Sequence, residues 1–190
     1  MILEDTRQQD GKHDNIERWM VAHGVDFAPR AAALPFGDYM LDGSNISVDT
    51  KQDLQEVAGN LGRDHARFVR ECERARAEGY RLVILIEQRG YGSVADVAGW
   101  TNRVCVRCQH RKWRRCDPST SKGCVAKRCK PMTGATLAKI MAKVEEDHGV
   151  RFEFCAPTST ARRICEILGV EYERRAATVG SGTGGAEVRQ

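Results

Sequence analysis

The sequence lacks the segments that would place the protein in a membrane or on a secretory route. No stretch of its 190 residues approaches the roughly 18 consecutive apolar residues that a membrane-spanning helix requires. The first residues, MILEDTRQQ, are acidic and lead directly into a predicted strand, so a signal peptide is not expected. There is no internal repeat. With 41% hydrophobic and 29% charged residues, the composition is typical of one compact globular domain.

The eight cysteines have no accompanying secretory signal. In this setting the thiols are expected to be reduced or bound to a metal rather than joined in disulfides. The sequence therefore predicts an intracellular protein, which would be cytoplasmic if its source is a bacterium or a phage.

Residues 35–51, PFGDYMLDGSNISVDTK, have the pattern of a β-hairpin. Gly43-Ser44 is a turn signal, because a glycine at the first central position supplies the positive φ of a type II′ turn. In the resulting register Tyr39 pairs with Val48. Side chains alternate between the two faces of a strand, so one face of the hairpin is predicted to be apolar and to consist of Tyr39, Leu41, Ile46 and Val48.

The opposite face of the predicted hairpin carries two acids. Asp38 and Asp49 pair across the strands, with Cβ atoms roughly 4.5–5.5 Å apart, where like charges are destabilising. Lys51 points to the same face. A divalent cation such as Mg²⁺ would balance the charge, because it takes carboxylate, water and phosphate oxygens as ligands. The pattern predicts metal-assisted phosphodiester hydrolysis, and the alternative is a solvated face with an Asp–Lys surface pair.

Three short motifs give the sequence a family resemblance. Asp38 followed by Asp49-Thr50-Lys51 resembles the PD-(D/E)XK nuclease signature. More narrowly, the sequence resembles the XPF-type nuclease domain of structure-specific DNA endonucleases. That family carries Asp-x-Arg, Gly-Asp-Tyr and Glu-Arg-Lys motifs, which are matched in order by Asp5-Thr6-Arg7, Gly37-Asp38-Tyr39 and Asp49-Thr50-Lys51. The resemblance covers residues 1 to about 88.

The resemblance implies a metal-dependent DNA endonuclease that acts on branched or flap DNA in repair or recombination. Asp38, Asp49 and Lys51 would be the catalytic residues. Asp38 and Asp49 would hold Mg²⁺ or Mn²⁺, with Asp5 of the first strand as a further ligand. Plain duplex DNA stays open as a substrate, because nothing in these residues independently selects branched DNA.

The sequence departs from the family motif at two positions. Thr50 stands where the family has an arginine, and Gln55 stands where it has a further acid. Asp53 and Glu56 lie close to Gln55, and Glu56 is kept as a candidate metal ligand. The candidate phosphate-binding residues, each with an ordinary surface arginine as the alternative, are Arg7, Arg63 and Arg67.

Positive charge is concentrated in residues 101–131. This segment holds ten lysines and arginines and a single acid, Asp117, whereas the rest of the chain holds 20 basic and 25 acidic residues. Localised basic charge is typical of a surface that binds a phosphate backbone. The candidate DNA-binding residues of the segment are Arg111, Lys112, Arg114 and Arg115.

The same segment contains five of the eight cysteines. A structural zinc site with four thiolates is predicted, and the candidate ligands are Cys105, Cys108, Cys124 and Cys129. Cys116 and His110 compete for these places. The alternative is a flexible basic loop with free thiols.

Other functions are compatible with these features. Some members of the family are catalytically silent DNA-binding or adaptor subunits, although the acid pair and Lys51 favour an enzyme. A zinc-stabilised protein-interaction module is the third hypothesis, for which the basic charge would be unnecessary. Family members usually work as dimers, so a homodimer or a protein partner joins DNA among the implied partners. We find no helix-hairpin-helix motif.

Alternating strand and helix patterns predict an α/β fold, a three-layer α/β/α sandwich with a central mixed sheet. The resemblance makes this a restriction-endonuclease-like fold. The predicted strands are residues 2–5, 25–34, the two arms of the hairpin, 81–87 and 151–155. The predicted helices are residues 12–22, 54–61, 64–78, 93–100, 133–148 and 158–169. We divide the chain into a nuclease core (1–100), a basic cysteine-rich insert (101–131), a C-terminal part of the core (132–175) and a disordered tail (176–190).

Overall fold

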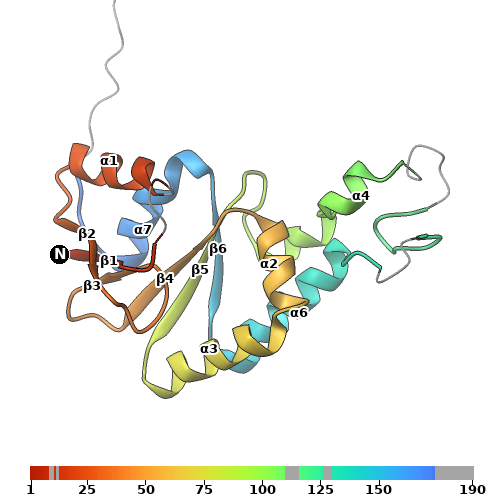
Figure 1. Cartoon of the computed structure of the whole chain (residues 1–190), viewed down its shortest axis with the longest axis horizontal. Helices are drawn as coiled ribbons and strands as arrows, with labels where there is room; N and C mark the ends of the chain where they lie inside the picture. The colour runs from red at the N-terminus through yellow and green to blue at the C-terminus, as the bar shows by residue number, and fades with distance from the viewer. Residues whose placement is uncertain (9–10, 12, 110–115, 126–129, 174–190) are drawn as a thin grey trace, which may run out of the picture.

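The computed structural model describes residues 1–8, 11, 13–109, 116–125 and 130–173, and its centre is a six-stranded mixed sheet (Figure 1). The strand order is β2-β1-β3-β4-β5-β6. Strand β3 pairs antiparallel with β1 and β4, and the other neighbouring pairs are parallel. The strands are β1 (Ile2–Asp5), β2 (Phe27–Ala32), β3 (Tyr39–Leu41), β4 (Ile46–Lys51), β5 (Arg81–Glu87) and β6 (Arg151–Cys155).

Helices cover both faces of the sheet, as predicted for a three-layer α/β/α sandwich (Figure 1). The helices α2 (Leu54–Leu61), α3 (His65–Ala77) and α6 (Gly134–His148) pack on one face, and α1 (Asp14–Ala22) and α7 (Thr160–Leu168) pack on the other. Two short 3-10 helices, η1 (Val94–Gly99) and η2 (Pro157–Ser159), precede the helix α4 (Arg103–Arg107) and α7, respectively. None of the helices in the described residues is long and apolar enough to cross a membrane.

Strand β5 lies between two parallel neighbours and is covered on both faces. Ile84 and Ile86 belong to the core beneath α2, α3 and α6, whereas Leu85 belongs to the core beneath α1 and α7. All three side chains are fully buried. A parallel strand with two covered faces needs a continuous apolar run, which is why RLVILIE was predictable as a central strand.

The hairpin has the predicted register, with Tyr39 opposite Val48 and Met40 opposite Ser47. Its turn differs from the prediction. The N–H of Ser44 donates to the carbonyl of Leu41 at 2.9 Å, and Gly43 has a φ of +74°. Gly43 therefore occupies the third position of a Leu41–Ser44 turn rather than the first central position of a two-residue loop.

Two other elements differ from the sequence prediction. The strand expected over residues 25–34 is shorter, and β2 runs parallel to β1 at the edge of the sheet rather than leading into the hairpin. The helix expected over residues 93–100 is the 3-10 helix η1, which Ser93 and Asp96 close with a capping box. The predicted tail, residues 176–190, lies outside the described residues.

The basic segment 101–131 connects η1 to α6 (Figure 1). It begins with α4, whose first residue, Arg103, pairs with Asp53 at the N-terminus of α2 at 2.5 Å. Further along, Asp117 and Lys122 form an isolated antiparallel bridge. The segment is thus joined to the side of the molecule on which α2 and α6 lie.

Candidate active site

Three neighbouring strands bring the predicted acids together. Asp5 ends β1, Asp38 directly precedes β3, and Asp49 lies within β4. The N–H of Asp5 donates to the carbonyl of Asp38 at 2.9 Å, and the N–H of Asp38 donates to the carbonyl of Val48 at 2.8 Å. These bonds fix the spacing of the three backbones, so the acids lie at adjacent positions on the sheet.

The acids line a cavity of about 200 Å³, which we call the acidic cavity. It lies between the sheet and the helices α2 and α3, and it includes six of the predicted residues. Its lining comprises Asp5, Arg7, Gln8, Gly37, Asp38, Asp49, Lys51, Asn60, Arg67, Phe68 and Glu71. Clefts that gather several convergent polar groups are the usual place for a binding or catalytic site.

The backbone at position 37, directly before Asp38, requires a glycine. Its φ is +65°, and a Cβ atom there would lie 2.4 Å from Ser47 Oγ and 2.8 Å from the carbonyl oxygen of Val48. Any larger residue would collide with β4 and would also be strained at this φ. The close approach lets the backbone of Asp38 bond to β4, and so places its carboxylate beside Asp49.

Asp49 and Lys51 form a nearly buried ion pair. Lys51 Nζ lies 2.7 Å from Asp49 Oδ1, and the two side chains are 13% and 12% exposed. Burial raises the pKa of Asp49 to about 6, because the Lys51 ammonium offsets it only in part and the carboxylates of Asp38 and Glu71 add to it. Burial opposes the charge of Lys51, but Asp49 and Asp38 hold its pKa above the ordinary lysine value.

Asp38 is oriented by three donors from two segments of the chain. Its Oδ2 accepts from the N–H of Thr50 at 2.8 Å and from the Thr50 hydroxyl at 2.5 Å. Its Oδ1 accepts from Nε2 of Gln8. Thr50 is the residue that replaces the family's arginine, so the departure from the motif adds a hydroxyl that holds Asp38.

Asp5 has a different environment from Asp49, because its carboxylate accepts four hydrogen bonds. One oxygen accepts from the backbone N–H of Arg7 at 2.7 Å and from Arg7 Nε at 2.8 Å. The other accepts from Arg7 Nη2 at 2.5 Å and from the N–H of Leu34 at 3.0 Å. Burial opposes its charge, but the Arg7 bonds lower the pKa of Asp5 below its usual value.

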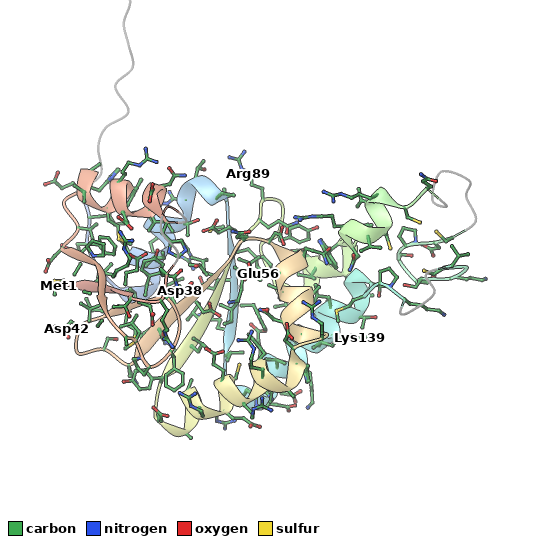
Figure 2. The ribbon with its side chains drawn as sticks, viewed as in Figure 1. Met1, Asp38, Asp42, Glu56, Arg89 and Lys139 are labelled. Atoms are coloured by element: carbon green, nitrogen blue, oxygen red, sulfur yellow. The ribbon has the colours of Figure 1, made fainter. Side chains whose placement is uncertain are left out.

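The acids near Gln55 are not among the described residues that line the acidic cavity. Asp53 accepts from the N–H of Glu56 at 2.9 Å and so caps α2, while Glu56 accepts from the N–H of Gln52 at 2.9 Å. Figure 2 shows Glu56 on α2 and Asp38 among the strands. Both carboxylates thus accept from backbone N–H groups at the start of α2, as the side chains of helix-capping residues do.

Glu71 of α3 lines the acidic cavity and was not identified from the sequence. It lies four residues after Arg67, which was a candidate and also lines the cavity. Residues four apart share one face of a helix, so this spacing was the signal that could have found it. Arg63, in contrast, has an 85% exposed side chain and lies 3.8 Å from Asp64.

The donor set suits a hard divalent cation better than a soft metal. Among the described residues no group of three or more His, Cys, Asp or Glu side chains is arranged to hold a metal ion. Asp38 and Asp49 are nevertheless a fit for Mg²⁺ or Mn²⁺, which commonly bind through one or two carboxylates plus waters and substrate phosphate. Burial is the main reason that the pKa of Asp49 is raised, and a bound cation would stabilise its ionised form.

The zinc prediction lies only partly within the described residues. Cys105, Cys108, Cys116 and Cys124 are each partly exposed, whereas Cys129 and His110 lie outside the described residues. The same holds for four basic candidates, namely Arg111, Lys112, Arg114 and Arg115. The zinc site and these DNA contacts therefore stay predictions.

Comparisons with known proteins agree with this architecture. No family model matches the chain, and no curated protein matches it. Among solved structures, XPF from Aeropyrum pernix matches with 21% identity and a TM-score of 0.52 over 88% of this chain and 59% of that chain. XPF from Aeropyrum pernix in complex with DNA matches with 20% identity and a TM-score of 0.50, over 88% and 62%. The chain thus spans about three fifths of the length of these structures, and it has an XPF-like nuclease fold.

Proposed function

We propose that the protein is a metal-dependent DNA endonuclease that hydrolyses phosphodiester bonds, with branched or flap DNA as its substrate. The observation that carries the proposal is the acidic cavity itself. It joins Asp38, a nearly buried Asp49 with a raised pKa, and Lys51 on an XPF-like nuclease fold. This is the charge pattern that a cation and a phosphate would complete.

In this proposal Asp38 and Asp49 hold Mg²⁺ or Mn²⁺. The bound metal would supply Lewis-acid polarisation of the phosphate and lower the pKa of a water molecule. Lys51 keeps its proton, because its pKa is above the usual value, and its ammonium group stabilises the charge that develops on the phosphate. Its contact with Asp49 fixes the position of that ammonium.

Asp5 and Arg7 support the site rather than take part in the reaction. The four hydrogen bonds of Asp5 occupy all of the roughly four acceptor positions of a carboxylate, so a metal ion would have to displace Arg7, whereas the three bonds of Asp38 leave one position open. Arg7 Nη2 also donates to the carbonyl of Leu34 at 2.8 Å. The pair thus ties the end of β1 to the segment that leads toward Asp38, and Asp38 and Asp49 are the preferred ligands.

The DNA backbone would be bound by positive charge on two sides of the acidic cavity. Arg67 lines the cavity, and it would bind a phosphate near the cut. The segment 101–131, with its ten basic residues and one acid, would hold the DNA farther away. Arg111, Lys112, Arg114 and Arg115 are proposed for that contact from charge alone.

One observation favours a second candidate, a catalytically silent DNA-binding or adaptor subunit. Gln55 replaces an acid of the family motif, and its side chain lines a cavity other than the acidic one. A site that lacks a required ligand would bind DNA without cutting it. A DNA-cleavage assay distinguishes the nuclease from the silent DNA-binding subunit.

Cleavage of end-labelled duplex, flap and four-way-junction DNA in Mg²⁺, Mn²⁺ or EDTA tests the proposal. The wild type is compared with Asp49→Asn and with Asp42→Asn, which removes the same charge from the exposed turn of the same hairpin. Metal-dependent cutting that only Asp49→Asn abolishes supports the nuclease. Binding without cutting in either metal favours the adaptor, and equal activity of both variants contradicts the site.

The zinc site is a separate proposal that rests on the cysteine spacing. Cys105, Cys108, Cys124 and Cys129 would bind one structural zinc ion per chain. Metal analysis of the purified protein is expected to find one equivalent of zinc, and Cys108→Ser is expected to lower that content. A zinc-free wild type would contradict the proposal without affecting the acidic cavity.

A further inference from the structure

A second cavity lies between the start of α2 and α4, on the side of α2 from which the basic segment extends (Figure 1). It has a volume of about 400 Å³ and shares none of the described residues that line the acidic cavity. We call it the amide cavity. Its lining residues are Asp53, Gln55, Gln88, Trp100, Thr101, Arg103 and Val106.

Two amides in this cavity are held by their carbonyl oxygens. Oε1 of Gln55 accepts from the N–H of Arg103 at 2.8 Å, and Oε1 of Gln88 accepts from the N–H of Leu54 at 2.8 Å. Neither amide nitrogen has an acceptor among the residues that the structure describes. Because the acceptor ends are bonded to the backbone, the two N–H₂ groups are left able to donate to a ligand.

Arg103 adds further donors to the same cavity. Its Nη2 lies 2.5 Å from Asp53 Oδ2, and its side chain is 55% exposed. A guanidinium carries five N–H groups, so one bond to Asp53 leaves others available to a ligand. Trp100 and Val106 supply apolar wall to the cavity.

Hydrogen-bond donors beside an apolar wall favour a ligand with a flat ring and acceptor atoms at its edge. An isolated phosphate is disfavoured by the carboxylate of Asp53 and by the apolar residues of the wall. A nucleobase meets all the requirements, since it has an apolar face and acceptor atoms at its edge. The donor-rich lining favours thymine, which presents carbonyl oxygens as acceptors and, unlike adenine, cytosine and guanine, has no exocyclic amino group.

We propose that the amide cavity receives one unpaired nucleobase of the DNA, a role that rests on the proposed nuclease function and narrows its substrate class. The two cavities involve opposite ends of α2, with Gln55 at one end and Asn60 toward the other. An eight-residue helix is about 12 Å long at 1.5 Å per residue. The unpaired base therefore lies a few nucleotides from the cut, at roughly 3.4 Å per nucleotide along a strand. Such a base exists beside a branch or a bulge and not in continuous duplex.

Two valines of α4 provide a matched test of this site. Val106 lines the amide cavity and Val104 does not, and the side chains are similarly exposed at 55% and 59%. Val106→Glu and Val104→Glu change the charge of the basic segment equally. The probe is a duplex with a single unpaired thymidine, compared with the same duplex carrying an abasic nucleotide at that position, and binding is measured by fluorescence anisotropy without added Mg²⁺ or Mn²⁺.

The wild type is expected to bind the thymidine probe about tenfold more tightly than the abasic probe. Val106→Glu is expected to reduce this ratio to less than about twofold, and Val104→Glu to leave it unchanged. Gln55→Glu, which keeps an acceptor for the Arg103 N–H but removes the amide donor, is expected to reduce the ratio as well. Equal affinity of the wild type for both probes, or an equal effect of the two valine variants, overturns the proposal.

Cleavage in Mg²⁺ or Mn²⁺ separates this inference from the proposed function. Base-dependent binding by a chain that cuts no DNA supports the amide cavity and contradicts the nuclease proposal. Metal-dependent cutting with no preference for the thymidine probe contradicts the amide cavity alone. A chain that binds neither probe contradicts both.

Discussion

Two of the buried acids of the sheet, Glu4 and Asp49, face opposite helical layers, and their surroundings shift their pKa values in opposite directions. Glu4 is fully buried and accepts from the Tyr39 hydroxyl at 3.0 Å, lies 3.0 Å from His13 Nδ1, and accepts from the N–H of Arg30 at 3.2 Å. Burial opposes its charge, but His13 and Tyr39 lower its pKa below the usual value. Asp49 is nearly buried, and among the described residues its hydrogen-bond donor is Lys51. Its pKa is raised.

The difference separates an acid whose charge the fold compensates from one whose charge it compensates only in part. A buried carboxylate that the fold provides with several donors is stable as an anion and needs nothing further. A buried carboxylate that lies beside a second acid and has one lysine as its partner keeps part of its negative charge uncompensated. A cation or another ligand that binds there would stabilise the ionised form. Perturbed acids of the second kind are common at functional sites, and Asp49 of the acidic cavity is such an acid.

The strongest test of the comparison is Asp49→Asn. We expect cleavage of flap DNA to fall by about a thousandfold, since a ligand of the proposed metal is lost. We also expect the melting temperature at pH 7 to stay level or rise, because the change removes a buried carboxylate whose ionised form is disfavoured. A circular-dichroism melt beside the cleavage assay checks both, and a large fall in the melting temperature would show that Asp49 is structural.

Glu4→Gln should have the opposite outcome. The substitution replaces a buried, hydrogen-bonded anion with an amide, which leaves His13 and Tyr39 with mismatched partners. We expect the free energy of unfolding to fall by about 3 kcal/mol, measured by urea denaturation. The fraction that remains folded should keep the metal-dependent activity of the wild type, and selective loss of activity without loss of stability would contradict the comparison.

The two acids should also respond to pH in opposite directions. The pKa of Asp49 is raised to about 6 in the folded chain, so its contribution to stability is present below its ordinary pKa and is lost as the pH rises through about 6. The contribution of Glu4, whose pKa is lowered, is present at neutral pH and is lost on acidification. In EDTA, the melting temperature of Asp49→Asn relative to the wild type should therefore increase between pH 4 and pH 7. A constant difference across this range would show that Asp49 is not perturbed.

The smallest expected effect concerns Thr50, an uncharged residue that helps to orient the carboxylate of Asp38. Thr50→Val removes the hydroxyl that donates to Asp38 Oδ2 and keeps the backbone N–H bond. If Asp38 is a metal ligand as proposed, we expect Mn²⁺ affinity, measured by calorimetry, to fall about tenfold, the usual effect of losing a residue that orients a ligand. Thr50→Ser should restore most of the affinity, and equal affinities of the two variants would contradict this role.

The sequence by itself determined the features that depend on local periodicity. The register of the hairpin follows from alternating side chains, so the pairing of Tyr39 with Val48 was predicted. The central strand Arg81–Glu87 and the helix Leu54–Leu61 have the predicted bounds, because a covered strand and an amphipathic helix each impose a short-range pattern. The motifs around Asp38 and Asp49 then located the acidic cavity.

Only the tertiary structure decided which distant residues complete each site. Glu71 reaches the acidic cavity because α3 packs with α2 and α6 on one face of the sheet, whereas Glu56, much closer to Asp49 in the sequence, faces the start of its own helix. The four hydrogen bonds of Asp5 depend on the path of the chain at Leu34, and the amide cavity depends on Arg103 docking on α2. Burial and the charges of neighbouring segments set the pKa of Asp49, and these are properties of packing that no local pattern contains.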